Sequence, residues 1–395
     1  MTSSGRPVLP ETAQGPAVAG PSPPGVWPAG FVAGAADRDA LLVLAHLEGM
    51  TPADLHGLAL MEGTARACLR AVAAGAARGA SARDRAVAER VDPGSVRAAL
   101  ALCGARMASP WDDDYPQGLL DLTDPPMCLF VRGTLPAPRP AVAMVGARRC
   151  TPYGREAAEM IASGLGAAGV TVVSGAAVGI DAAGHRGALR AGGPTVAVLG
   201  SGIDVPYPPR NAGLIEAIVR AGAVVSEYPP GIQARPHRFP ARNRLVAALV
   251  QGVIVIEGAP GSGSLITVEF ALDLGRDVLA VPGAITGPLS DVPHTLIRDG
   301  AALIRGPEDV LETLGLAPQR SPPGGPEPVP GPAGTGLTED ERRFLELVPG
   351  TPATLDAVAR SAGMDPARAL RFLGALELGG LVTAEGGRYR RAGPG

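Results

Sequence analysis

The sequence predicts an α/β protein with a mostly parallel sheet covered by helices on both faces, between a small helical domain and a winged-helix-like domain. Three observations support this prediction. Short β-rich runs alternate with helical stretches over residues 109–314, these runs are apolar throughout, and Pro- and Gly-rich segments cover residues 1–35 and 315–336. Apolar strands separated by helices are typical of a parallel sheet that is buried on both sides. We expect the two Pro- and Gly-rich segments to be a disordered start and a linker.

Residues 36–108 carry helix signals. A run that begins at Asp37 has apolar residues at helical spacing, and Thr51-Pro-Ala-Asp and Val91-Asp-Pro-Gly each begin a further helix. We expect a small helical domain of the helix–hairpin–helix or SAM-like type. Its short Gly-containing turns could contact a nucleic-acid backbone or serve packing alone.

The sheet domain, 109–314, is expected to alternate strands and helices. Strands are predicted over 127–131, 141–145, 170–173, 195–199, 223–226, 253–256, 278–281 and 302–304. Helices are predicted near 153–168, 179–191, 209–221, 243–251, 264–275 and 307–314. Ligands of such sheets bind beyond the carboxyl ends of the strands.

The tail, 337–395, holds three helical stretches near 338–347, 354–361 and 366–378, followed by β-rich runs that begin at Leu381 and Arg388. Three helices and a hairpin in so short a segment predict a winged-helix-like domain. Such a domain could bind duplex DNA or protein.

The composition excludes several functions. All 35 basic residues are Arg, which excludes a Walker A lysine, a Schiff-base lysine and a lysine general base. The formal net charge is −3, so any nucleic-acid site must be a local basic patch. Aromatic residues make up 3% of the chain, so base stacking would depend on very few rings. No set of nucleophile, base and orienting residue is visible, and we expect neither an enzyme nor a cofactor.

The cysteines and the hydropathy pattern indicate the compartment. Cys68, Cys103, Cys128 and Cys150 share no C-x-x-C spacing, so we expect reduced thiols rather than a zinc site or a disulfide framework. No apolar run reaches the roughly 18 residues of a membrane span, and prolines interrupt the start, where a signal peptide needs an apolar core. These observations predict a cytoplasmic protein without a metal.

Three strand-to-helix turns are rich in Gly and small polar residues. They are Val145-Gly-Ala-Arg-Arg, Ser174-Gly-Ala-Ala-Val-Gly and Gly258-Ala-Pro-Gly-Ser-Gly-Ser. Gly lets a backbone approach a ligand closely, and helix N-termini present N–H groups to phosphate oxygens. Three such loops at one sheet edge predict an anion site. A nucleotide is poorly supported, because Ser264 occupies the P-loop lysine position and no G-x-G-x-x-G follows a strand.

The most basic stretch is Arg235-Pro-His-Arg-Phe-Pro-Ala-Arg-Asn-Arg. It contains four arginines around Phe239, and no acidic residue occurs from Gly231 to Gln251. Guanidinium groups suit phosphates, and a ring offers a stacking face for an unpaired base. The alternative interpretation is the solvated, salt-bridged start of a helix.

A series of motifs resembles the DNA-processing protein A (DprA/Smf) family over residues 111–314. The motifs, in chain order, are Asp114-Tyr-Pro, Val145-Gly-Ala-Arg, Thr151-Pro-Tyr-Gly, Ser174-Gly, Gly179-Ile-Asp, His185-Arg-Gly-Ala-Leu, Ala197-Val-Leu-Gly-Ser-Gly-Ile-Asp, Tyr207-Pro, Ser226-Glu-Tyr-Pro-Pro-Gly, Phe239-Pro-Ala-Arg-Asn-Arg, Ser262-Gly-Ser-Leu-Ile-Thr, Gly275-Arg and Val281-Pro-Gly. The flanking domains also resemble those of the family, less specifically.

The resemblance implies an extended Rossmann-like fold that binds single-stranded DNA, protects incoming DNA and loads the RecA recombinase onto it, in natural transformation or recombination. It also implies a homodimer. The DNA-binding residues that it implies are Gly146, Arg148, Ser174, Gly175, Gly179, Arg238, Phe239, Arg242, Asn243, Arg244, Ser262, Gly263 and Ser264. The chain departs from the family pattern at Val178, Val292 and His294, where a basic residue, Gly and Asn are usual.

Four further titratable side chains in these motifs are interpreted as structural. Asp181 is expected to cap or hold its Gly-rich loop, with His185 packed or hydrogen-bonded beside it. Glu227 and Glu257, at strand ends, are expected to be partners of the arginines.

Two other functions remain open. A nucleoside-monophosphate phosphoribohydrolase of the lysine-decarboxylase-like group uses a related sheet, and Pro260-Gly-Ser-Gly-Ser…Glu269 loosely resembles its loop with a different spacing to the Glu. The other is a regulatory winged-helix DNA binder with a ligand-sensing core.

Overall fold

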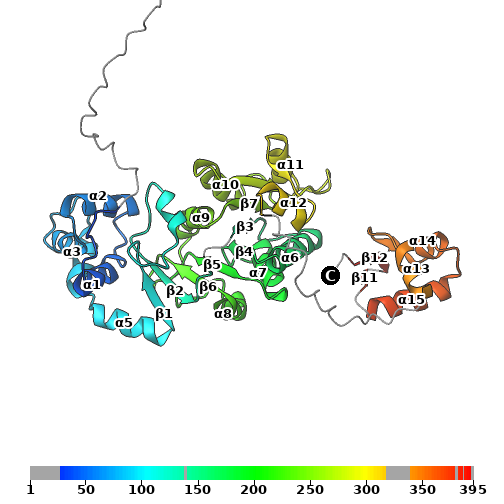
Figure 1. The fold of residues 1–395 in the computed structure, drawn as a ribbon, viewed down its shortest axis with the longest axis horizontal. Helices are drawn as coiled ribbons and strands as arrows, with labels where there is room; N and C mark the ends of the chain where they lie inside the picture. The colour runs from blue at the N-terminus through cyan, green and yellow to red at the C-terminus, as the bar shows by residue number, and fades with distance from the viewer. Residues whose placement is uncertain (1–26, 138–139, 317–338, 379–380, 386, 393–395) are drawn as a thin grey trace, which may run out of the picture. The chain divides into compact units, whose positions relative to one another are not determined.

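The computed structural model describes residues 27–137, 140–316, 339–378, 381–385 and 387–392 (Figure 1). Most of the expected disordered start and nearly all of the expected linker therefore lie outside the described residues. The chain divides into two compact units, Met1–Leu316 and Ala317–Gly395.

Five helices come first in the described part of the first unit. They are α1 (Ala35–Leu44), α2 (Pro52–Glu62), α3 (Ala65–Ala73), α4 (Ala82–Arg90) and α5 (Pro93–Leu102). Capping boxes begin two of them: Thr51 with Asp54 at α2, and Ser81 with Asp84 at α4. The helix start predicted at Thr51 is thus confirmed.

A nine-stranded sheet follows. Its strands are β1 (Ala105–Ala108), β2 (Leu129–Gly133), β3 (Ala141–Val145), β4 (Thr171–Ser174), β5 (Thr195–Leu199), β6 (Ala223–Ser226), β7 (Gly252–Val255), β8 (Asp277–Ala280) and β9 (Ala302–Leu303). The spatial order is β1-β2-β6-β5-β4-β3-β7-β8-β9. From β6 to β9 all neighbours are parallel, whereas β1 and β2 add an antiparallel edge.

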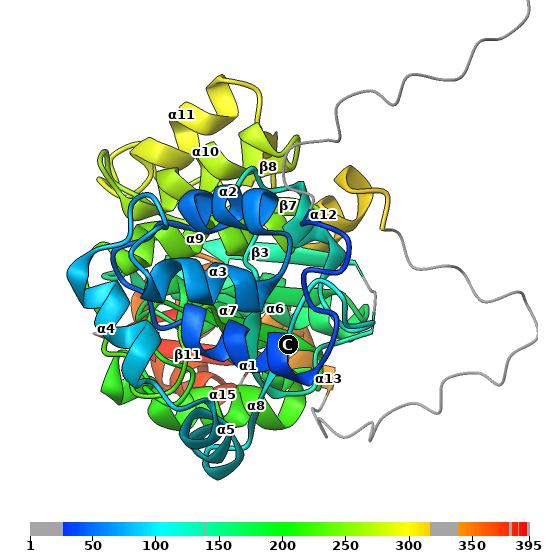
Figure 2. The ribbon, with the colours of Figure 1, turned by 90° about the vertical axis from the view of Figure 1, so that its left-hand side faces the viewer.

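Helices cover both faces of the sheet (Figures 1 and 2). They are α6 (Pro152–Ala167), α7 (Ile180–Arg190), α8 (Ala212–Ala221), α9 (Arg238–Ala248), α10 (Gly263–Asp273), α11 (Asp291–Arg298) and α12 (Pro307–Thr313), with 3-10 turns η1 (Gln117–Asp121) and η2 (Pro209–Asn211). In β3, Val142 and Met144 pack toward α6 and α7, whereas Ala143 and Val145 pack toward α9 and α10. The mostly parallel, two-sided α/β architecture that the sequence predicts is confirmed.

The connection order creates one switch point. From β3 the chain adds β4, β5 and β6 on one side, and it then returns to place β7, β8 and β9 on the other side of β3. The loop after β3 therefore leads toward one side of the sheet, and the loop after the neighbouring strand β7 leads toward the other side. Rossmann-like sheets bind ligands in the crevice at this point.

Three elements of the sheet region differ most from the sequence prediction: the start of α9, strand β1 and the unpredicted helix α11. The helix expected at 243–251 begins at Arg238, because Pro240 falls in its first turn, where a missing N–H is tolerated. Strand β1 was missed because it is an antiparallel edge strand, and only Ala108 of its four residues is buried.

The second unit contains α13 (Glu339–Leu347), β10 (Ala353–Thr354), α14 (Leu355–Ser361), α15 (Pro366–Leu378), β11 (Val382–Glu385) and β12 (Arg388–Arg391). The strands form an antiparallel sheet in the order β10-β12-β11. Phe344, Val358, Leu373 and Val382 form the centre of its core. The predicted winged-helix-like arrangement is confirmed, with β10 as an unpredicted third strand.

Among the described residues, no helix combines the length and the apolar character that a membrane span requires.

Candidate nucleic-acid interface

A cleft of about 310 Å³ lies at the switch point between β3 and β7. Its walls come from the loop after β3, the loop after β4, helix α9 and the start of α10. Nine of the thirteen residues that the sequence analysis assigned to DNA binding line it: Gly146, Arg148, Gly175, Phe239, Arg242, Asn243, Ser262, Gly263 and Ser264. The structure thus brings together residues from four separate segments of the chain.

One wall of the cleft pairs a cation with a ring. The guanidinium carbon of exposed Arg148 lies 5.8 Å from the centroid of the half-buried Phe239 ring. The ring of Tyr207 packs against the ring of Phe239, with the two ring centroids 5.1 Å apart. This wall therefore combines an exposed cation, which suits a phosphate, with two aromatic rings, the type of group on which bases stack. The role of Tyr207 was missed, although Tyr207-Pro is one of the family-like motifs.

Arg242 lies deeper in the cleft and is 5% exposed. Its Nη1 donates a hydrogen bond to the carbonyl oxygen of Val198. Burial and the nearby charge of Arg148 lower the pKa of Arg242 to about 10, against the opposing effect of Asp181. At neutral pH the guanidinium still carries its charge into a partly desolvated site, where electrostatic interactions are strong.

The loop after β4 is held close to the loop after β3. Gly179 has φ +82°, and a Cβ at this position would lie 2.2 Å from the carbonyl oxygen of Ala147. Asp181 accepts a hydrogen bond from the backbone N–H of Ala177 at 3.2 Å, as expected of a residue that holds this loop. Buried Ser174 instead donates to the carbonyl oxygen of Met144 at 2.6 Å. Gly179 and Ser174 therefore shape the loop without lining the cleft.

The N-terminus of α10 forms the opposite wall. Ser262 caps the helix by accepting from the N–H of Ser264, and the two hydroxyls are 2.6 Å apart. Asn243 donates from Nδ2 to the carbonyl oxygen of Gly263 at 3.3 Å, which ties α9 to this wall. A helix N-terminus carries a partial positive charge that favours anions.

Arg238 and Arg244 do not line the cleft. Arg244 is buried and pairs with Asp124 at 3.2 Å and Glu227 at 2.7 Å. Burial lowers the pKa of Arg244, but these two carboxylates outweigh that effect and raise it overall. Arg238 is buried as well and pairs with Glu48 at 2.8 Å. The alternative interpretation, a solvated and salt-bridged helix start, is right about the ion pairs of these two arginines and wrong about their solvation, because both are buried.

The expectations for the acidic residues are met in part. Glu227 is a partner of Arg244, as the sequence analysis expected. Glu257 pairs with none of the arginines that the structure describes: its carboxylate accepts from the backbone N–H and the hydroxyl of Thr151, at 2.8 and 2.5 Å, next to the N-terminus of α6. The sequence does not reveal this role, because the two residues are far apart in the chain.

Three residues depart from the family pattern or belong to the hydrolase alternative. Val292 is buried, and His294 places Nε2 at 3.0 Å from the carbonyl oxygen of Gly283.

Glu269, the acid of the phosphoribohydrolase-like loop, is exposed on α10 and is not among the residues that line the cleft. The structure therefore does not bring together the loop and the acid that this hydrolase would need.

The fold and the cleft together define a Rossmann-like protein with a basic, ring-containing crevice at its switch point and a winged-helix unit at its C-terminal end. The family described as DNA recombination-mediator protein A matches residues 106–315, and the DprA winged helix domain matches residues 327–388. The chain belongs to the DNA recombination-mediator protein A family.

Relatives and a solved structure agree with this assignment. The chain is 41% identical over 310 residues to a Mycobacterium tuberculosis protein that is named as a DNA processing protein DprA. This match covers 74% of this chain and 79% of the relative. It is 38% identical to protein Smf of Escherichia coli, which covers 70% and 75% of the two chains. The crystal structure of DNA processing protein A from Streptococcus pneumoniae superposes with a TM-score of 0.60 at 35% identity, covering 70% of this chain and 97% of that chain.

Proposed function

We propose that the cleft between β3 and β7 binds single-stranded DNA. One observation carries the proposal: Arg148 lies over the Phe239 ring, near the buried charge of Arg242, where three Gly-containing loops and a helix N-terminus converge. Cations track the phosphates of a single strand, and the ring offers an unpaired base a stacking surface. The names of the family and of its relatives, which refer to DNA processing and recombination, support the same ligand class.

The cleft favours an unpaired strand over a duplex. A ring can stack only on a base that has left the helical stack, whereas duplex contacts are mostly to outward-facing phosphates and groove edges. Phe239 is half-buried beside Arg148 and Asn243, so a base that reaches it enters the cleft. We infer that phosphates contact Arg148 and the α10 N-terminus while a base contacts Phe239.

The proposed role is binding without bond chemistry and without a cofactor. Asp181 is committed to its own loop, and burial raises the pKa of its carboxyl despite the nearby charge of Arg242. His185 is fully buried and hydrogen-bonds to Thr195 at 2.7 Å. Asp181 lines the cleft while it holds the loop after β4, and His185 ties α7 to β5 in the protein interior.

The wider role that we propose is to protect incoming single strands and to load the RecA recombinase onto them in the cytoplasm, as a homodimer, in natural transformation or recombination. The family description, a recombination mediator, supports the handover of DNA to a recombinase. Adding the protein to RecA and single-stranded DNA that is coated with a single-strand-binding protein should speed filament formation.

The binding proposal is tested with a fluorescent single-stranded oligonucleotide and its duplex. We expect the protein to prefer the single strand, and Arg148→Ala to weaken this binding by about 1.5–3 kcal/mol, the range for a charged hydrogen bond. Arg190→Ala is the matched control. Arg190 is the last residue of α7, near the amino ends of the strands and away from the cleft, and it pairs with Glu159. Equal affinities for the parent and Arg148→Ala would place the site elsewhere.

A further inference from the structure

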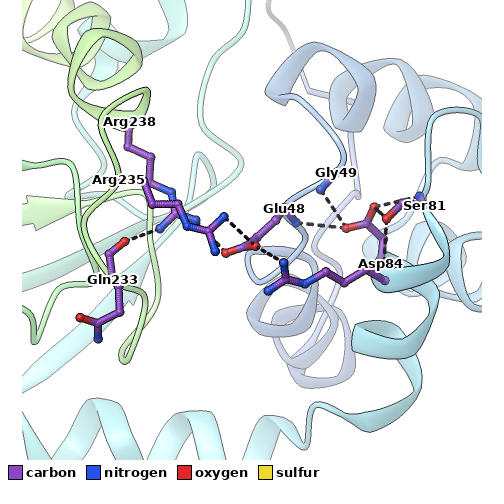
Figure 3. Close-up of polar contacts among 8 residues, drawn as sticks. Glu48, Gly49, Ser81, Asp84, Gln233, Arg235 and Arg238 are labelled. Carbon is purple, nitrogen blue, oxygen red and sulfur yellow. Dashed lines mark hydrogen bonds and ion pairs between the residues drawn. The ribbon is translucent and has the colours of Figure 1, made fainter.

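Glu48 connects the helical part of the first unit to the start of α9. It lies between α1 and α2, and its carboxylate pairs with Arg238 at 2.8 Å and with Arg235 at 3.3 Å (Figure 3). A third arginine, Arg83 from α4, approaches the same carboxylate at 3.1 Å. One acidic side chain thus holds two of the four arginines in the basic stretch that leads into and forms α9.

The loop that presents Glu48 is itself fixed. Asp84 is fully buried, and its Oδ1 accepts from the backbone N–H groups of Glu48 and Gly49 at 3.1 and 3.0 Å (Figure 3). Its other oxygen accepts from the N–H and the hydroxyl of Ser81 at the capping box of α4. The backbone at Glu48 therefore has little freedom to move, and it holds the carboxylate in place against the start of α9.

Arg238 has few alternatives to this contact. It is 4% exposed, and its guanidinium lies 4.7 Å from the centroid of the Tyr228 ring. Its Nη1 donates to the carbonyl oxygen of Gln233 at 2.6 Å. A buried guanidinium that loses its carboxylate must find water, because an unpaired buried charge is strongly unfavourable. A cavity of about 380 Å³, lined by both Glu48 and Arg238, leaves room for Arg238 to turn toward water once the carboxylate is gone, and the first turn of α9 would shift with it.

That first turn also carries part of the cleft. Arg238 is the first residue of α9, Phe239 is the next, and Arg242 and Asn243 follow one turn later. A shift of the turn would therefore separate Phe239 from Arg148 and Tyr207. We propose that Glu48 is a positioning residue for the cleft, holding the start of α9 so that Phe239 stands beside Arg148. This proposal rests on the function proposed above.

Simple electrostatics gives the opposite expectation. Glu48 is a negative charge near a DNA site, so its removal would strengthen DNA binding if it only masked arginines. Positioning predicts weaker binding, although the variant has gained one unit of positive charge. Whether affinity rises or falls on removal of Glu48 therefore distinguishes charge masking from positioning.

The test compares Glu48→Gln with Asp39→Asn. Both remove one negative charge from the helical part, but Asp39 pairs with Arg97 and not with α9. Affinity for a single-stranded oligonucleotide and hydrogen exchange of the backbone amides in 235–243 are measured for each. We expect Glu48→Gln to bind about two- to thirtyfold more weakly, the range of couplings between distant sites, with faster exchange in this segment. Asp39→Asn should match the parent, and Glu48→Asp should recover part of the affinity.

The outcomes separate this inference from the proposed function. Unchanged exchange in 235–243 would show that Glu48 does not fix α9, whether or not the protein binds DNA. Faster exchange with unchanged or stronger binding would show that α9 moves without affecting the cleft, and it would also overturn the inference. A parent protein that binds no single strand would instead refute the proposed function and the DNA-binding role of Glu48, and the exchange data would then report on the fold alone.

Discussion

The guanidinium of Arg242 lies directly against Gly175: a Cβ added to Gly175 would stand 2.3 Å from Nη1 and from Nη2. No side chain larger than hydrogen fits beneath the buried arginine without moving it. Glycine at 175 therefore fixes where the charge of Arg242 stands in the cleft, in addition to any backbone contact with a ligand.

Gly175→Ala should displace Arg242 and weaken single-strand binding. We expect a loss of about tenfold, which corresponds to about 1.4 kcal/mol, because the guanidinium leaves its position and its bond to Val198. Gly213→Ala on α8 is the control, since nothing lies within 4 Å of its added Cβ. That change should leave affinity unaltered and raise stability by up to about 1 kcal/mol. Parent-like binding by Gly175→Ala would mean that the position of Arg242 does not matter.

Phe239 is expected to stack on a base. Phe239→Leu keeps an apolar side chain against Tyr207 but removes the ring, so binding should fall by about 1–3 kcal/mol with the salt dependence unchanged. Affinity and melting temperature are measured on the same variant. A lower melting temperature with normal affinity would show that the ring serves packing alone.

Stability should fall as the pH drops from 6.5, because His185 is buried in its neutral form. The hydroxyl of Thr195 donates to the carbonyl oxygen of Val172, so it accepts from Nδ1–H of His185, and Nε2 carries no proton. Burial, with the charge of Arg242, lowers the pKa of His185 from 6.5 to about 3. Between these values the unfolded chain binds a proton that the folded chain does not.

The linkage gives the sign and size of this effect. The free energy of unfolding should decrease by up to about 1.4 kcal/mol per pH unit on acidification between pH 6.5 and about 3, and be unaffected by His185 above that window. Denaturant unfolding at pH 6 and pH 5, above the range of most carboxylates, measures it. His185→Gln should show a shallower slope; an identical slope would refute a buried neutral His185.

The sequence predicts the parallel strands well, because each is a short, wholly apolar run between helices. Predicted 141–145, 195–199 and 223–226 coincide with β3, β5 and β6. Strand β1 and helix α11 carry no such signal, since β1 is mostly unburied and only Val292 and Pro293 of α11 are buried.

The candidate site is predicted less evenly. Loops that follow parallel strands meet at one edge by topology, so Gly146, Gly175 and Gly263 could be grouped from the sequence. Which arginines face the cleft depends on carboxylates that are distant in the chain. Glu48 is 190 residues from Arg238, and no local pattern reports that contact.

Removing the C-terminal unit should leave the cleft intact. The first unit ends at Leu316, and all residues that line the cleft precede that point. Residues 1–316 should therefore bind single strands with the affinity of the full chain, whereas any duplex binding that the winged-helix unit supplies should be lost. A folded 1–316 fragment that no longer holds single strands would place the site in the other unit.

The salt dependence of single-strand binding tests the central claim most directly. Each Arg–phosphate contact releases counterions, so the logarithm of the binding constant should fall against the logarithm of salt by about 0.7 per contact. Arg148→Ala should flatten that slope by about 0.7, and Arg190→Ala should leave it unchanged. Equal slopes for the parent and Arg148→Ala, or equal flattening by Arg190→Ala, would contradict a phosphate site at the carboxyl ends of β3 and β7.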